Sequence, residues 1–255
     1  MVSAMKPPSV AAGALLFCLV MWAWAQRADD GQKNDGPQPR VVTPGAQPGQ
    51  PPSDAIVLFD GRNSAEWVYG DGRPSEWPIV DGALACKSGT GNIYTRRKFG
   101  DAQIHLEFAT PFMPQAHGQA RANSGVYLQG RYEIQILDSV DTPTYANGSC
   151  GALYGQYAPL VNACRPPKQW QTYDIIFHAP VCRADKTISE PGTVTVLHNG
   201  VLVQDHVAIR GRTTSSDDTD PCTDGPLMLQ DHKHPDVKET FMQFRNIWIR
   251  PLRRP

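Results

Sequence analysis

The sequence has no stretch long enough for an ordinary helix in which apolar residues recur with helical spacing. Such a helix would show apolar side chains three and four positions apart over several turns. No internal repeat is evident either. The two absences argue against a helical or repetitive architecture.

The chain also has no excess of either charge sign. Its 24 Lys and Arg residues nearly balance 25 Asp and Glu residues, and the formal net charge is −1. A near-neutral chain gives no electrostatic reason to expect nucleic acid or an anionic membrane surface as a partner. Its 255 residues, 40% of them hydrophobic, suit one globular domain with a sizeable core, with or without appendages.

The N-terminal residues 1–25 have the pattern of a secretory signal peptide. Lys6 gives a weakly positive start, residues 10–22 form an apolar run, and Ala23-Trp24-Ala25 ends it with small residues around one large one. Cleavage is therefore expected before Gln26. The run is short for a membrane span of about 20 residues, so we expect export to the periplasm or the extracellular space, with no membrane span after signal removal.

Residues 26–53 have little aliphatic content and are rich in Pro, Gly, Gln and Asp. Such a composition cannot bury enough apolar surface to fold by itself, and it predicts a disordered Pro/Gly-rich tether. The folded domain is therefore expected at residues 54–255.

The cysteines include no C-x-x-C pair, which argues against a structural zinc site. Export would permit disulfides among the five cysteines that follow the signal peptide. The preferred pairs flank the same loop or region, and Cys86 would remain a buried thiol. The preferred pairs are Cys150–Cys164 and Cys182–Cys222. The sequence alone does not fix this connectivity.

Turn-forming residues are abundant, with 22 Gly and 23 Pro. Between them lie about a dozen short segments in which apolar and polar residues alternate, as in β-strands. Residues 193–198 and 201–207, for example, flank Asn199-Gly200, one of the strongest short hairpin signals. The pattern predicts an all-β, single-domain antiparallel sandwich, with a closed barrel as the alternative.

One stretch, residues 123–138, reads NSGVYLQGRYEIQILD and carries the clearest candidate site. It predicts a hairpin with a two-residue turn at Gly130-Arg131. Alternation sends both isoleucines of the second strand into the core. It places Glu133 and Gln135 side by side on the opposite face, about 7 Å apart, or two strand rises.

Other side chains are expected to reach the same face and contact a substrate. Tyr127 and Gln129 come from the partner strand, and Gln230 comes from a later strand-like segment. Tyrosine rings beside polar groups are suited to holding sugars, because a ring covers the apolar C–H face of the sugar. On this ground we single out Tyr127 and Tyr154.

Asp138 completes the spacing E-x-Q-x-x-D with Glu133. Glucanases of the concanavalin-like jelly-roll class carry E-x-D-x-x-E, in which two carboxylates act as nucleophile and acid/base. A bulge would be needed to bring Asp138 onto the face of Glu133. The middle acid is Gln135 here and the last is one carbon shorter, so retaining glycosidase chemistry is not favoured.

Residues 227–232, LMLQDH, place His232 on the same face as Gln230 by alternation. If this strand lines the face that carries Glu133, His232 becomes a candidate base. Glu133 and His232 are also the candidate ligands of a divalent metal ion, and His234 could substitute.

The order of several short motifs resembles that of the 3-keto-disaccharide hydrolase family. The resemblance extends over residues 55–252, and the Glu133 strand and the Phe-Arg-Asn-Ile ending carry most of its specificity. The segments concerned are Phe59-Asp60-Gly61, residues 123–126, residues 132–138, residues 151–154, residues 170–173 and residues 244–247.

The resemblance implies a concanavalin-like sandwich with a concave, sugar-binding face, and action on 3-keto-glycosides. A ketone at sugar C3 acidifies the proton on C2, so a base can remove that proton and the C1 substituent can leave by elimination. Glu133 and His232 would serve as catalytic groups, with Gln135 and Asp138 assisting and a divalent cation as a further stabiliser.

Two rival functions remain open from the sequence. A non-catalytic carbohydrate-binding module would have aromatic side chains but no titratable group within reach of a bound sugar. A conventional retaining glucanase would hold the carboxyl groups of Glu133 and Asp138 about 5–5.5 Å apart.

Overall fold

The computed structural model describes residues 38–213, 216, 219–233 and 242–253. The described residues from 42 onward belong to one compact unit. The predicted signal peptide and the first part of the predicted tether lie outside the described residues. None of the helices in the described ranges has the length and apolar character that a membrane span requires.

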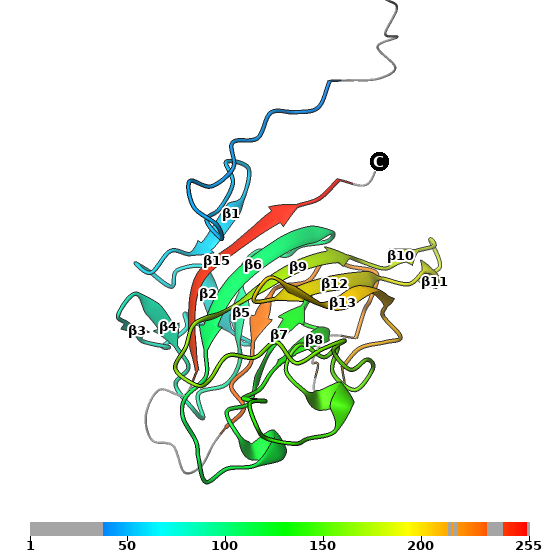
Figure 1. Cartoon of the computed structure of the whole chain (residues 1–255). Coiled ribbons are helices and arrows are strands. Elements are labelled where there is room, and N and C mark those ends of the chain that lie inside the picture. The colour runs from blue at the N-terminus through cyan, green and yellow to red at the C-terminus, as the bar shows by residue number, and fades with distance from the viewer. Residues whose placement is uncertain (1–37, 214–215, 217–218, 234–241, 254–255) are drawn as a thin grey trace, which may run out of the picture. The chain divides into compact units, whose positions relative to one another are not determined.

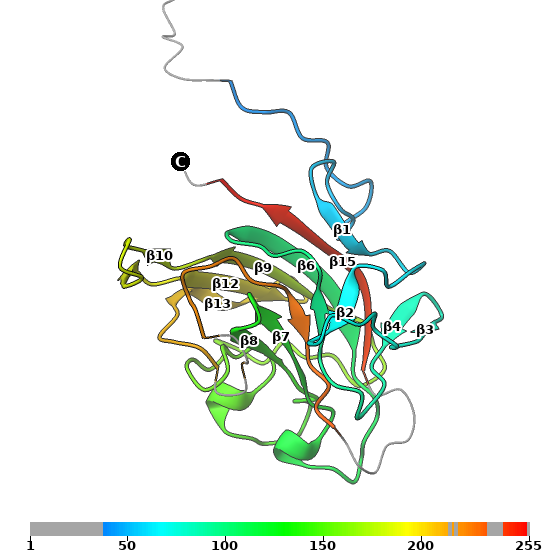
Figure 2. The same ribbon diagram turned by 180° about the vertical axis from the view of Figure 1, so that it is seen from behind.

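The domain is a sandwich of two antiparallel sheets, shown from opposite sides in Figure 1 and Figure 2. The large sheet has the order β13-β12-β9-β6-β15-β4-β3, and β1 pairs with β15 beside this path. Its strands are β1 (Ile56–Phe59), β3 (Ile79–Val80), β4 (Ala83–Ala85), β6 (Ala102–Ala109), β9 (Gln171–His178), β12 (Thr193–His198), β13 (Val201–Ala208) and β15 (Gln243–Pro251).

The small sheet has five strands in the order β2-β5-β14-β7-β8. Two separate sheets make the predicted sandwich correct and the closed barrel wrong. A two-stranded ribbon, β10–β11, extends from the large sheet, and two short 3₁₀ turns, η2 and η3, lie in loops. The bounds are β2 (Trp67–Tyr69), β5 (Ile93–Thr95), β7 (Ser124–Leu128), β8 (Tyr132–Ile136), β14 (Met228–Leu229), β10 (Val181–Cys182), β11 (Ile188–Glu190), η2 (Gly118–Ala120) and η3 (Ala146–Gly148).

The core lies between the sheets, because alternate side chains of each sheet point towards the other. Ile104, Leu106 and Phe108 of β6 and Ile134 and Ile136 of β8 belong to the same buried cluster. The predicted inward direction of the two isoleucines in β8 is therefore confirmed.

Replacing Ile136 with Ala should lower the free energy of unfolding by about 2–5 kcal/mol, because the fully buried side chain leaves a cavity. Urea denaturation measures this loss. The matched control is Ile188→Ala, since Ile188 is exposed on β11, and its effect should stay within about 0.5 kcal/mol. Equal losses in the two variants would contradict the assigned core.

The β7–β8 turn differs from the prediction. The ladder ends at the pair Leu128–Tyr132, so the loop has three residues, and the backbone N–H of Arg131 donates to Leu128 O at 3.0 Å. Gln129 and Gly130 both have positive φ, at 53° and 67°. The predicted two-residue turn at Gly130-Arg131 is wrong because the left-handed backbone already begins at Gln129.

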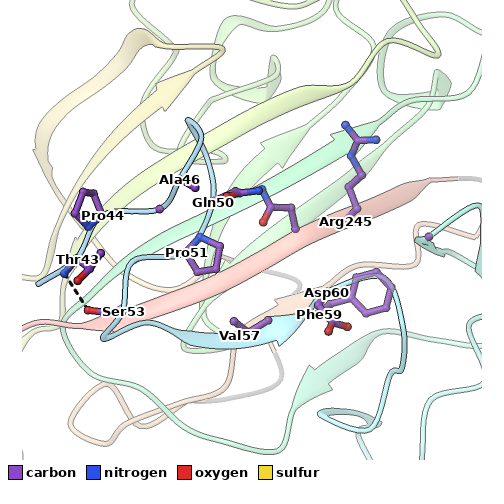
Figure 3. A pocket seen from close by; sticks show the side chains of 13 residues that line it. Thr43, Pro44, Ala46, Gln50, Pro51, Ser53, Val57, Phe59, Asp60 and Arg245 are labelled. Atoms are coloured by element: carbon purple, nitrogen blue, oxygen red, sulfur yellow. Dashed lines mark hydrogen bonds between the residues drawn. The ribbon is translucent and has the colours of Figure 1, made fainter.

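Part of the predicted tether is folded. Residues 43–53 form a strap against the outer face of the large sheet, where the side chains of Asn246 and Trp248 donate to Gly49 O at 2.9 and 2.8 Å. Figure 3 shows the strap beside β1 and β15, closed on itself by a hydrogen bond from Thr43 N to Ser53 Oγ. A cavity of about 710 Å³ lies between them. The prediction of disorder is therefore wrong for residues 43–53, because the Gly49 carbonyl of the strap accepts hydrogen bonds from two side chains of the sheet.

The outer face of the large sheet also buries His105 beneath the strap. Burial alone would lower the pKa of His105, but hydrogen bonds to Asp174 and Glu107 outweigh it and raise that pKa to about 9. Gly49 lies so close to this ring that a Cβ there would meet His105 Cε1 at 3.1 Å. We assign this network to docking of the strap.

One of the two predicted disulfides is present. Cys182 and Cys222 are bonded, with their Cα atoms 5.6 Å apart. Cys150 and Cys164 are free thiols, as is the buried Cys86. The predicted Cys150–Cys164 disulfide is therefore wrong for this structure, in which Cys150 Sγ instead lies 3.1 Å from the hydroxyl of Tyr173.

Candidate functional site

The side of the small sheet that points away from the core carries a row of polar side chains. Tyr127 of β7 pairs with Glu133 of β8, and Gly125 pairs with Gln135. On the other side of β7, the backbone N–H of Gln230 donates to Gly125 O at 3.0 Å. Paired positions in a sheet share a face. We call these five residues the polar face.

Glu133 is the charged residue of the polar face, and only 3% of it is exposed. The hydroxyl of Tyr127 donates to Glu133 Oε2 at 2.8 Å and accepts a hydrogen bond from Gln230 Nε2 at 3.0 Å. Burial disfavours the carboxylate and raises the pKa of Glu133 to about 7, although the Tyr127 hydrogen bond acts in the opposite direction. A carboxyl group with this pKa can both accept and release a proton near neutral pH.

Gly125 provides the space that this carboxylate occupies. A Cβ at Gly125 would lie 2.5 Å from Glu133 Oε1 and 2.9 Å from its Cγ. Its φ is not in the left-handed region, so the backbone conformation does not demand glycine here. The absence of a side chain at Gly125 is what allows Glu133 to lie across β7.

A set of amide side chains adjoins Glu133. Gln135 Nε2 donates to Gln119 Oε1 at 3.1 Å and to Gly148 O at 3.3 Å. Gln119 Nε2 donates to Gly148 O, and Asn123 Nδ2 donates to Gln119 O, both at 2.9 Å. Backbone carbonyls can only accept hydrogen bonds, so they fix which end of each amide is nitrogen.

Three amide oxygens of the site are left as acceptors. Within the part of the chain that the structure describes, Asn123 Oδ1, Gln135 Oε1 and Gln230 Oε1 are buried and have no hydrogen-bond partner. A buried acceptor without a donor is costly, and it usually marks a place that a ligand or water fills. Sugar hydroxyls are donors of the required kind.

Tyr154 joins the polar face from a neighbouring loop. Its backbone N–H donates to Glu133 O at 3.0 Å, and its hydroxyl shares a short hydrogen bond with that of Tyr145. Burial and the Tyr145 hydroxyl raise the pKa of Tyr154, and the charge of Glu133 adds to the effect. Tyr145 is about half exposed, so this tyrosine pair presents aromatic surface next to the carboxylate.

Two predicted site residues do not join the polar face. Asp138 lies five residues beyond Glu133. Its carboxylate accepts hydrogen bonds from Arg121 Nε at 2.6 Å and from the backbone N–H of Val140. Gln129 lies in the turn, where its amide contacts Phe99 O and Arg131. Alternation fails for Gln129 because its positive φ turns the side chain out of the strand pattern.

His232 lies at the margin of the site. The register places Met228 beside Tyr127 and Gln230 beside Gly125, so the chain moves away from Glu133 as it approaches His232. The residue is exposed, yet neighbouring protein atoms partly desolvate its ring, and this lowers the pKa of His232. His234 lies outside the described residues.

The predicted metal site at Glu133 and His232 has few donors. Among the described residues, no third histidine, cysteine or carboxylate joins these two in a group close enough to share one ion. The neighbours of the carboxylate are a tyrosine hydroxyl and neutral amides, which fit a sugar better than a divalent cation.

The sequence did not reveal Gln119, Tyr145 or Gly125 as site residues. Gln119 and Tyr145 lie in or beside the short 3₁₀ turns of long loops, where no periodicity predicts a direction. The glycine in Asn-Ser-Gly-Val could have been noticed, since glycine inside a strand often marks a close approach of another group.

Comparison with known proteins identifies the family. The model of the 3-keto-alpha-glucoside-1,2-lyase-like domain matches residues 54–250. A Parabacteroides distasonis protein provisionally assigned as a glycosyl hydrolase is 43% identical, with a TM-score of 0.78 over 85% of this chain and 93% of that chain. A search of curated proteins found no match.

Two further P. distasonis structures with the same provisional assignment are 19% and 21% identical and support the fold alone. Their TM-scores are 0.58 and 0.53, and each match covers 78% of this chain, with 94% and 99% of the other. The family model covers most of the chain, and the resemblance seen in the sequence is confirmed: the chain belongs to the 3-keto-alpha-glucoside-1,2-lyase-like domain family.

Proposed function

We propose that this carbohydrate-active hydrolase cleaves the glycosidic bond of 3-keto-glycosides by elimination, with Glu133 as the base. The observation that supports the proposal most is the combination of a buried carboxyl group of pKa about 7 with three unpartnered amide acceptors beside it. The amides would bind sugar hydroxyls while the carboxylate removes a proton from carbon.

The reaction would proceed in two stages. The Glu133 carboxylate takes the proton on C2, and the electron pair left behind forms an enolate with the C3 ketone. The enolate then expels the C1 substituent, which leaves as an alcohol after it takes up a proton, and a C1–C2 double bond remains. Water finally adds its oxygen to C1 and a proton to C2, which gives the free 3-keto sugar.

The remaining polar groups receive supporting roles. Gln135 and Gln230 would accept hydrogen bonds from sugar hydroxyls through the oxygens that the protein leaves unpaired. The Tyr145–Tyr154 pair would cover an apolar sugar face. We assign His232, at the solvent margin, to proton transfer with the leaving group or the incoming water, so His232→Ala should cost less activity than loss of Glu133.

The conventional glucanase is disfavoured by the position of Asp138. Its carboxylate is held by Arg121 Nε at 2.6 Å and by the backbone N–H of Val140, and not by a group of the polar face that carries Glu133. Its ion pair with Arg121 leaves it no acid/base role. The binding-module alternative lacks a reason for a buried carboxyl group of raised pKa, which costs stability.

The test is to incubate the purified protein with a glycoside and its 3-keto derivative side by side, with and without chelator. We expect the alcohol to be released from the 3-keto derivative and not from the plain glycoside. The chelator should not prevent this release. Hydrolysis of the plain glycoside at an equal rate would contradict the elimination. Tight binding of an ordinary oligosaccharide, with no turnover of any keto-glycoside, would favour the binding module.

Tyr127→Phe should move the pH profile of the reaction upward by about one unit or more. The hydroxyl of Tyr127 stabilises the Glu133 carboxylate, and a hydrogen bond to a charged group is worth about 1.5–3 kcal/mol. Since the base must be ionised, kcat/KM should rise through pH 7 in the wild type and at higher pH in the variant. Tyr69→Phe is the control, because the Tyr69 hydroxyl accepts the backbone N–H of Glu76 and does not contact Glu133. An unchanged profile in Tyr127→Phe would refute Glu133 as the titrating group.

We also propose that the protein acts outside the cytoplasm. The Cys182–Cys222 disulfide is of the kind that persists in exported proteins. Removal of residues 1–25, which the sequence pattern favours, would be visible in the intact mass of the protein isolated from its native compartment.

A further inference from the structure

A second cluster of reactive side chains lies between the two sheets, behind the polar face. Cys150, Cys164 and His198 each offer one ligand atom, and these atoms all lie within 4.8 Å of one another. Cys150 and His198 are fully buried, and Cys164 is partly buried. The first two lie in the long loop between β8 and β9, and the third ends β12.

The hydrogen bonds around His198 fix its tautomer. Its Nε2 lies 2.8 Å from Gln171 Oε1, which also accepts the backbone N–H of Arg165 at 2.9 Å. The Arg165 N–H can only donate, so this atom of Gln171 is the oxygen, and His198 Nε2 must carry the proton. The lone pair of the ring is therefore on Nδ1.

His198 Nδ1 is buried, and no described residue supplies a hydrogen bond to it. An imidazole with one nitrogen donating to an oxygen, while the other nitrogen keeps a free lone pair, is arranged as metal-binding histidines are. The two sulfur atoms are the ligands that a soft or borderline metal ion adds to imidazole.

We propose that Cys150, Cys164 and His198 bind a zinc ion. Tetrahedral zinc, with bonds of about 2.3 Å to sulfur and 2.0–2.1 Å to nitrogen, places its ligand atoms roughly 3.6–3.8 Å apart. The three ligand atoms lie within 4.8 Å of one another, so their largest separation exceeds that spacing by no more than about 1 Å. Cys164 is the least buried of the three residues, so a water molecule can take the fourth position from its side.

Such an ion would fasten the loop of the candidate site to the large sheet. Next to Cys150, the backbone N–H of Gly151 donates to Gln135 O at 2.9 Å, and Gln135 N donates to Ala152 O at 3.0 Å. The hydroxyl of Tyr173 donates to the same Gln135 carbonyl. Zinc would thus hold the backbone on which Gln135 and Tyr154 stand. The C-x-x-C spacing is absent because the fold, and not the sequence, brings these three ligands together.

The experiment measures zinc in the full-length mature protein after expression with Zn²⁺ and gel filtration. We expect one zinc ion per chain by elemental analysis in the wild type and in Cys86→Ala, a buried cysteine outside the cluster. Cys164→Ser and His198→Ala should lose it. Cys164→Ser is nearly isosteric at a partly buried position, so it should stay folded even if His198→Ala does not.

A second readout is independent of metal purification. Co²⁺ added to the metal-free wild type should give the absorption bands of thiolate-bound tetrahedral cobalt, and Cys164→Ser should weaken them. Zinc retained in both variants would overturn the proposal. A wild-type protein that contains no zinc would also overturn it, whether Cys150 and Cys164 are free thiols or are joined in a disulfide. The disulfide would lower the intact mass by two hydrogen atoms.

Discussion

Glu133→Gln should lower kcat on a 3-keto-glycoside by about 10²- to 10⁴-fold, the usual loss when a general base is removed. Glutamine keeps the shape of the side chain and can still accept the Tyr127 hydroxyl through its oxygen. It cannot take a proton from carbon. The residual rate should also lose the rise through pH 7 that the carboxyl group imposes on the wild type.

The same variant should be more stable than the wild type above pH 7. The pKa of Glu133 is about 7 in the folded protein and about 4.3 in an unfolded chain, so ionisation opposes folding as pH rises from about 4.3 to 7. The full cost, on the order of 4 kcal/mol, persists above pH 7 and is absent in Glu133→Gln. A higher melting temperature at pH 8 would show that the loss of activity is not loss of fold.

Glu190→Gln is the matched control, because Glu190 is exposed on β11. It should leave both the rate and the melting temperature unchanged. Wild-type turnover in Glu133→Gln would refute Glu133 as the base. A large fall in its melting temperature would instead show that the buried carboxyl group has a structural role.

The alternation of apolar and polar residues correctly predicted which side chains of a single strand face the core and which face the site. Ile134, Ile136, Glu133 and Gln135 take the faces that a period of two assigns to them, because β8 is regular. Gln129 departs from the pattern where the backbone turns left-handed. No periodicity within one segment can describe such a position.

The sequence could not predict how buried the site is. Alternation places Glu133 on the face opposite the core, but it does not show that Gly125, Tyr127 and the loop that bears Tyr154 surround the carboxylate. These neighbours come from separate segments whose approach is set by tertiary packing. The raised pKa of Glu133, which supports its role as a base, depends on that packing and is invisible in the spacing of polar residues.

Gly125→Ala should lower kcat/KM by about 10²-fold while the protein stays folded. The added Cβ would lie 2.5 Å from Glu133 Oε1, so the carboxylate must move away from β7. A displacement of about 1 Å in a reacting group can cost a factor of 10². The backbone should tolerate alanine, because the φ of Gly125 is not positive.

Gly70→Ala is the matched control for this variant. Gly70 also lacks a positive φ, and its added Cβ would make an ordinary contact at 3.6 Å with Tyr94 Cε2. The measurements are kcat/KM on a 3-keto-glucoside and the pH at which the rate reaches half its maximum. Gly125→Ala should change both, because a displaced carboxylate also loses its alignment with the Tyr127 hydroxyl, whereas Gly70→Ala should change neither. If Gly125→Ala keeps the wild-type rate and pH profile, the position of the carboxylate over β7 is not the one used in the reaction.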